Sequence, residues 1–180
     1  MHLTQVVRSS VFSLAVVLLS LGVFGCSTTQ EEPDPEPLTP SQAQRTYLEV
    51  MCPVNEAWYE VDLRVDTLRS ARAIDPPDLD AHQQALIESL EEFARINEEA
   101  AEALTKSIPS MPEQSQQPLQ QVSGILHDDA VEAKELADTQ SVDELVQHEW
   151  PADASRTDTV QRTRDALGLN QDEAPSCESL

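Results

Sequence analysis

Apolar residues recur at the spacing of a helix in the first half of the chain. Between positions 47 and 68 the apolar residues are spaced alternately four and three apart: Tyr47, Met51, Val54, Trp58, Val61, Val65 and Leu68. This spacing predicts one long helix whose apolar stripe packs at a shallow angle on its neighbours, and it places Trp58 in the core. Pro53 is expected to kink or restart that helix. Thr39, followed by Pro40 and Gln42, has the sequence of a capping box and should begin it.

Two further apolar stripes predict two more long helices. Asp75-Pro76-Pro77-Asp78 should end the first helix and cap the second. The second stripe, which Asn97 interrupts, contains Leu79, Leu86, Leu90, Phe93, Ala100 and Leu104. A connection rich in Ser, Pro and Gln covers residues 107–118. The third stripe follows this connection and contains Leu119, Val122, Leu126, Ala130, Ala133, Leu136 and Ala137. It is rich in alanine, so it should lie close to a neighbour while contributing less burial.

Shorter helices are expected toward the C-terminus. Ser141 and Glu144 are spaced as a capping box and should open a short helix that Trp150-Pro151 stops. A last helix over residues 155–167 should end before Gly168, the residue type favoured just past a helix end. No segment has the alternation of a strand. The chain is therefore predicted to be all-α, an antiparallel bundle of three long helices plus short C-terminal helices.

The N-terminal segment has the parts of an export signal. Residues 11–24 form an apolar run of 14 residues after Arg8, shorter than the roughly 20 residues that cross a bilayer. Val23-Phe24-Gly25-Cys26 resembles the bacterial lipobox, with a branched apolar residue at −3, a small residue at −1 and cysteine at +1. Phenylalanine at −2 departs from the usual small or β-branched residue. We expect residues 1–25 to be removed as a lipoprotein signal peptide and Cys26 to carry the lipid.

Lipidation also accounts for the residues that follow. Two long acyl chains, such as palmitate, anchor a protein stably because each buried CH₂ contributes about 0.8 kcal/mol. Residues 26–38 are polar and rich in proline and acids, as a disordered tether should be. Residues 39–180 would form the helical domain, at the extracytoplasmic face of the cell membrane. The alternatives are an ordinary signal peptide with a chance cysteine and an uncleaved helical anchor.

Assigning Cys26 to lipid leaves Cys52 and Cys177. An even pair of cysteines in an exported protein is most simply a disulfide. It would close a loop of roughly 125 residues, which the chain-entropy model values at about 4 to 5 kcal/mol. A catalytic thiol is less favoured because neither cysteine has a histidine nearby in sequence. A metal site would need more thiols or a regularly spaced histidine pair.

The formal net charge of −22, from 33 acidic and 11 basic residues, limits the partners. A field of this sign repels phosphate backbones and anionic headgroups, so no nucleic acid is expected as a partner. Cation binding or a basic partner would explain the acidity. A solvated surface that keeps an exported protein soluble would also explain it, and this second interpretation is favoured because the acids are spread along the chain.

Few residues have a pattern that predicts chemistry. None of the three histidines beyond the leader, His82, His127 and His148, belongs to a Glu-x-x-His or His-Glu-x-x-His motif. Glu144 with His148, or His127 with the two aspartates after it, could hold a divalent ion weakly, but exposed polar pairs are the favoured interpretation. No metal ligands and no cofactor are predicted.

Adjacent acids such as Glu91/Glu92 and Glu98/Glu99 leave a helix in different directions and supply no general acid–base pair. Tyr59, beside the apolar stripe, and Trp150, at a helix stop, could line a ligand groove, although packing over the helix ends is favoured. No catalytic residue is predicted, and the chain is not expected to be an enzyme.

Short motifs at both ends of the mature domain resemble a loose group of small lipoproteins from high-GC Gram-positive bacteria. They are the lipobox, Tyr47 followed by Cys52-Pro53-Val54-Asn55, and Ala166-Leu167-Gly168-Leu169 ahead of Ser176-Cys177. Residues 75–150 have no counterpart in this resemblance. Because the group is largely of unknown function, the resemblance implies an envelope location and a Cys52–Cys177 clamp, but no activity.

These observations favour a membrane-anchored, non-enzymatic binding or scaffold module of the cell envelope. It would attach to the membrane through the Cys26 lipid and present a surface to an envelope protein. The alternative is a carrier of a small ligand or cation.

Overall fold

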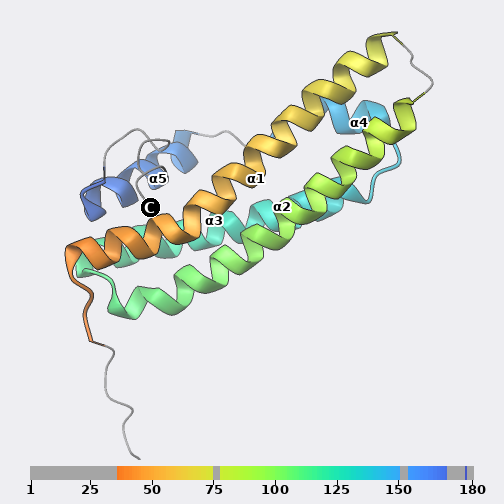
Figure 1. The fold of residues 1–180 in the computed structure, drawn as a ribbon. Helices are drawn as coiled ribbons and strands as arrows, with labels where there is room; N and C mark the ends of the chain where they lie inside the picture. Colours follow the sequence, from red (N-terminus) through yellow and green to blue (C-terminus); the bar gives the residue numbers. More distant parts are fainter. Residues whose placement is uncertain (1–35, 75–77, 151–153, 170–176, 178–180) are drawn as a thin grey trace, which may run out of the picture. The chain divides into compact units, whose positions relative to one another are not determined.

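The computed structural model describes residues 36–74, 78–150, 154–169 and 177 (Figure 1). The predicted signal peptide, Cys26, most of the predicted tether and most of the tail around Cys177 lie outside the described residues. Within them the chain forms five α-helices, one short 3₁₀ helix and no strand. The elements are α1 (Pro40–Ile74), α2 (Leu79–Ser107), η1 (Ile108–Ser110), α3 (Glu113–Ala137), α4 (Val142–Gln147) and α5 (Ala154–Leu167). For this part of the chain the prediction of an all-α fold is confirmed.

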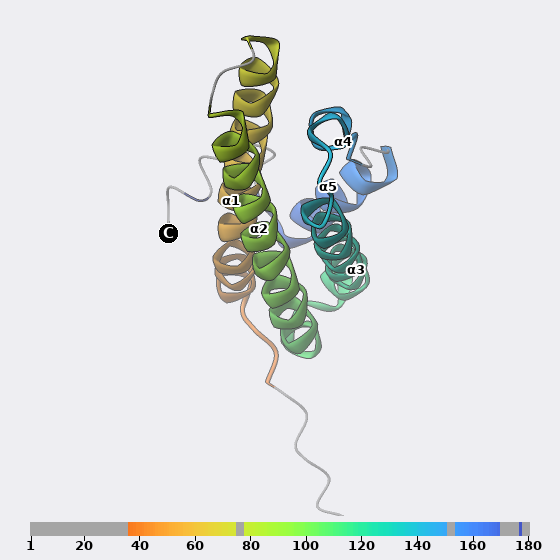
Figure 2. The ribbon, with the colours of Figure 1, turned by 90° about the vertical axis from the view of Figure 1, so that its right-hand side faces the viewer.

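Helix α2 packs along both α1 and α3, and Figure 2 shows it between them. Helix α5 packs on α3 and also reaches α1. An ion pair between Arg156 and Asp129 of α3 holds its start. A 2.8 Å hydrogen bond from Nε2 of the Gln44 side chain in α1 to the Leu167 carbonyl holds its end. Helix α4 contacts α1, where Arg72 and Asp143 form an ion pair.

The three predicted stripes supply most of the core. Helix α2 buries Leu86, Leu90, Phe93, Ala94, Asn97, Ala100, Ala101 and Leu104. Helix α3 buries every residue of its predicted stripe, and α4 and α5 close the core with Leu145, Val146 and Leu167. Each buried Leu or Phe contributes about 1.5 to 3 kcal/mol relative to an exposed position. None of the helices in the described ranges is long and apolar enough to span a membrane.

The α1 stripe differs from its prediction at Trp58, and Val65 is only partly buried. Tyr47, Met51, Val54, Val61 and Leu68 are buried as expected, but Trp58 is 39% exposed and Ala57 beside it is only 9% exposed. An α-helix has 3.6 residues per turn, so a stripe of residues that repeats every 3.5 positions drifts around the helix by about 20° per heptad. The drift brings small Ala57 to the inner side and places Trp58 at the edge. The prediction that Trp58 lies in the core was therefore wrong.

Of the two outcomes expected at Pro53, a restart of the helix is excluded, because one continuous α1 runs through it. The predicted start of the third helix needs correction. Helix α3 begins at Glu113, before Pro118 rather than after it. Pro118 falls within the second turn and removes one backbone donor. Burial of Ser115 and Leu119 on the two sides of it holds this turn against the core.

The helix ends follow the predicted capping in three places out of four. Thr39 and Gln42 form the expected box, with the Thr39 amide donating to the Gln42 side chain at 2.9 Å, and the Ser141 hydroxyl accepts from the Glu144 amide at 3.3 Å. Gly168 has a φ of 70°, and the amide after it bonds to the Arg164 carbonyl at 2.9 Å, as in a Schellman motif. Asp78 stands at the cap of α2 but makes no side-chain capping bond, contrary to prediction.

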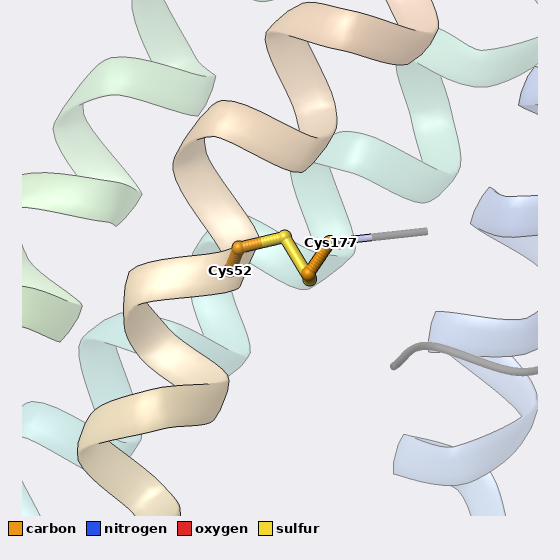
Figure 3. The surroundings of a disulfide bond; sticks show 2 residues. All are labelled: Cys52 and Cys177. Carbon is orange, nitrogen blue, oxygen red and sulfur yellow. A yellow bond between two sulfur atoms is a disulfide. The ribbon is translucent and has the colours of Figure 1, made fainter. Parts of the chain in front are cut away.

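The predicted cysteine pair is joined in the structure. The sulfur atoms of Cys52 and Cys177 lie 1.98 Å apart, and the Cα atoms 5.7 Å apart (Figure 3). The bridge spans 125 residues of sequence and ties the C-terminal tail to the side of α1. A loop of this length removes about 4 to 5 kcal/mol of conformational entropy from the unfolded chain.

Asn97, the polar residue inside the second stripe, is completely buried. Its Nδ2 atom donates to the Phe93 carbonyl at 2.8 Å, whereas Oδ1 has no hydrogen-bond partner among the described residues. A buried acceptor without a partner costs about 1 to 3 kcal/mol. The amide is thus a point of local destabilisation in an otherwise apolar stripe.

We predict that Asn97→Leu raises the free energy of unfolding by about 1 kcal/mol, because leucine has a similar volume and leaves no unpaired acceptor. Urea unfolding followed by circular dichroism measures the change. A loss of stability in this variant would contradict the prediction and indicate that Oδ1 is satisfied by a buried water.

Candidate binding surfaces

One face of α1 exposes large apolar side chains. Tyr59 is 68% exposed and Leu63 is 46% exposed, and their separation of four residues makes them neighbours on the helix surface. Glu56 and Asp62 lie three residues before Tyr59 and three after it, and both are exposed. We call these four residues the Tyr59 face. The face begins one turn beyond Cys52 and points away from the side of α1 that buries Val54 and Val61.

The opposite edge of α1 takes part in an aromatic cluster. The Trp58 ring lies 5.6 Å from Phe93 of α2 and 5.2 Å from Trp150, and Trp150 in turn contacts Phe93 and His148. Edge-to-face contacts of this kind add about 0.5 to 1.5 kcal/mol each beyond the area they bury. Trp150 therefore packs on Trp58 and Phe93, as the favoured interpretation expected. Tyr59 is 68% exposed, so for this residue the packing interpretation was wrong.

A hollow of about 550 Å³ lies between the end of α3 and α4. Its walls carry four carboxylates and one imidazole, from Glu132, Glu135, Asp143, Glu144 and His148. Three of the carboxylates have partners that hold α4 in place: Asp143 pairs with Arg72, Glu144 accepts from the Thr139 hydroxyl, and Glu132 lies 3.0 Å from His148 Nε2. The hollow is thus walled mainly by contacts that dock α4.

The histidine–carboxylate pairs foreseen as weak ion sites are not formed. His148 approaches Glu132 rather than Glu144, at ion-pair distance but without the geometry of a hydrogen bond. His127 is exposed, and Asp129 beside it binds Arg156. Across the described residues no group of three or more His, Cys, Asp or Glu side chains is placed to hold a metal ion.

A second hollow, of about 310 Å³, lies between α1 and α2 beside Pro53. Its floor is mostly apolar, with Val50, Ile96, Ala100 and Ala103 next to the proline. Glu49, Arg95 and Glu99 stand at its sides, and Arg95 forms ion pairs with both Glu92 and Glu99. Hydrogen bonds from Arg95 hold the pKa of Glu92 below its usual range. The Glu91/Glu92 and Glu98/Glu99 pairs are exposed, as expected, and Glu92, Glu98 and Glu99 form ion pairs.

The ion pair of Asp129 and Arg156 is the most buried of those between helices. Its side chains are only 19% and 22% exposed, and it fixes the first turn of α5 to α3. Burial raises the pKa of Asp129 above its ordinary value of 3.8, although the hydrogen bond and the charge of Arg156 act in the opposite direction. The folded state therefore favours a protonated Asp129 more than the unfolded state does.

We predict a pH-dependent stability difference between the wild type and Asp129→Asn. The pKa of Asp129 is higher in the folded state than the ordinary value of 3.8, so at a pH below 3.8 protonation of Asp129 stabilises the folded state. This stabilisation is lost as the pH rises through the folded-state pKa. The wild type should lose stability relative to the variant over that window. Urea unfolding at a series of pH values from about 3.5 to 7 measures this, with exposed Asp138→Asn as control. A difference that grows in favour of the wild type would show that the Arg156 pair outweighs burial.

Sequence reasoning found some of these features and missed others. It identified Cys52 and Cys177, the exposed acid pairs and the packing of Trp150. It could not find the Glu132–His148 or Asp129–Arg156 contacts, whose partners are 16 and 27 residues apart on different elements. Cys26 lies outside the described residues. Comparison of the chain with protein-family models, with curated proteins and with solved structures finds no match.

Proposed function

We propose that this chain is a lipid-anchored, extracytoplasmic binding module without enzymatic activity, which holds an antiparallel helical bundle at the cell membrane and presents a surface to an envelope protein. The observation that carries the proposal is the Cys52–Cys177 bridge. Disulfides form and persist in oxidising compartments outside the cytoplasm. The third cysteine, Cys26, stands at the cleavage position of a lipobox-like sequence behind an export signal.

The point at which the chain enters the domain supports presentation of a surface. The Leu38 amide donates to the Ser110 carbonyl at 2.7 Å, so the chain enters the domain beside η1. Helix α1 begins two residues later and extends for 35 residues, or about 50 Å at 1.5 Å per residue. Its far half, which includes Leu63 and Ile74, is thus separated from the point of attachment. The resemblance to small lipoproteins of high-GC Gram-positive bacteria supports the envelope location in this proposal.

Lipidation at Cys26 is the first test. We predict that the wild type incorporates an alkyne-tagged palmitate and sediments with membranes, whereas Cys26→Ser loses the label and is released. Cys52→Ser/Cys177→Ser serves as the matched control and should keep the label, because neither cysteine belongs to the lipobox-like sequence. Retention of unlabelled Cys26→Ser in membranes would refute the lipid anchor and favour an uncleaved helix. In the released protein, reduction should add two hydrogens to the intact mass.

A second candidate function is the carriage of a small apolar ligand, because the groove beside Pro53 reaches the lower size limit of ligand sites, which span about 300 to 1,000 Å³. A carrier should bind the neutral probe N-phenyl-1-naphthylamine at one site, with a rise in fluorescence. We predict that Ala103→Phe, which fills the groove, abolishes this binding, while Val131→Phe on the surface of α3 leaves it unchanged. Equal binding by both variants, or none by the wild type, counts against the carrier.

A further inference from the structure

We propose that the Tyr59 face binds a basic segment of a partner protein. In this complex Tyr59 and Leu63 contact apolar side chains of the segment, and Glu56 and Asp62 pair with its lysine or arginine side chains. The inference names the partner class for the binding module proposed above, and it rests on that proposal. It is carried by the combination of exposed Tyr59 and Leu63 with Glu56 and Asp62 on one stretch of α1.

The acids of the face differ from the other acids of the same half of α1. Glu60 binds Arg64 and Asp66 binds Arg69, both at 2.6 Å. Neither Glu56 nor Asp62 has an ion pair or side-chain hydrogen bond among the described residues. Their charges are therefore available to a cation from outside. Lysine or arginine side chains that reach both of them would pass over the ring of Tyr59, where a cation gains a further contribution of about 0.5 to 1 kcal/mol.

The apolar pair gives the face more than charge. A single exposed apolar residue is ordinary on a protein surface, but Tyr59 and Leu63 are adjacent, and together they offer a ridge that a partner can cover. Tyrosine supplies a large contact area with little loss of side-chain freedom and is enriched at interfaces. A basic segment with interspersed apolar residues would cover the ridge and place its cations over the two acids.

The backbone beneath the face is held from two sides. The disulfide at Cys52 fixes α1 one turn before Glu56, and the Trp58 ring packs on Phe93 and Trp150 at the edge of the core. A surface on a rigid helix loses less entropy on binding than one on a loop. The face is therefore preorganised for docking.

Charge selects among the possible occupants. A second copy of the chain carries the same net charge of −22 and would place carboxylates against carboxylates. An anionic membrane surface is repelled for the same reason. A basic protein segment is attracted, and complementary charge also speeds its encounter with the face. We therefore assign the face to a basic partner segment.

The test uses the full chain as isolated from cells, whether or not Cys26 carries a lipid, in an uncharged detergent. The probe is a short helical peptide of lysine and leucine with the lysines on one side. Tyr59→Ser/Leu63→Ser should weaken peptide binding about tenfold, the loss expected when the centre of an interface is removed. Val131→Ser is the matched control, since Val131 of α3 is 43% exposed, and it should leave the affinity within about twofold. Fluorescence anisotropy of the labelled peptide measures the affinity, and circular dichroism checks that each variant is folded.

A second pair of variants tests the carboxylates at equal net charge. Glu56→Gln/Asp62→Asn should weaken binding several-fold more than Glu88→Gln/Glu91→Gln on the surface of α2. Equal weakening by the two pairs would reveal binding to the general acidity of the chain and overturn the proposal. Absence of wild-type binding, or an unchanged affinity of Tyr59→Ser/Leu63→Ser, would overturn it as well. None of these results depends on palmitate labelling at Cys26, so failure here is distinguishable from failure of the lipid anchor.

Discussion

Burial of α2 on two sides is the constraint on which the rest of the domain depends. The helix packs along both α1 and α3, and its leucines at 86, 90 and 104 are completely enclosed. Because α1 and α3 each meet α2, the positions of both follow from its apolar surface. Helix α4 then covers apolar surface of α1 that α2 does not contact, and α5 does the same on α3. The Asn97 Oδ1 atom, which has no hydrogen-bond partner among the described residues, lies within this same surface. The main packing surface of the fold therefore also contains a group that lowers the stability of the folded state.

The last third of the chain shows how short helices complete such a core. Proline after Trp150 prevents one continuous helix, and the chain instead forms α4 and α5. Each is fixed to the long helices by polar contacts at its ends, Arg72 with Asp143 for α4 and Arg156 with Asp129 for α5. Trp150, between them in sequence, contributes its ring to the cluster on Phe93. Apolar burial and ion pairing thus act at different points of the same segment.

The acidic surface and the disulfide have opposite effects on stability. A net charge of −22 on 180 residues opposes compaction through repulsion between like charges. The bridge from α1 to Cys177 offsets this by restricting the unfolded chain. The same acidity leaves carboxylates such as Glu56 and Asp62 without internal partners, which makes a surface with exposed Tyr59 and Leu63 suited to a cationic partner. Stability and the proposed binding function are therefore linked through the distribution of charge.

The sequence by itself determined the helical class, the three long apolar stripes, the capping at Thr39, Ser141 and Gly168, and the pairing of Cys52 with Cys177. These features follow from the spacing of apolar residues, from the residue types at helix ends and from the number of cysteines, so they can be predicted without knowing which residues are neighbours in space. Tertiary structure decided the exposure of Trp58, the start of α3 before Pro118, and the partners of His148 and Asp129. Each of these depends on which side chains meet in the folded chain. Ala57 fits the inner side of α1 where Trp58 does not, and burial on both sides of Pro118 stabilises a turn that proline alone would break. Glu132 and Arg156 meet their partners only when α3, α4 and α5 are packed together.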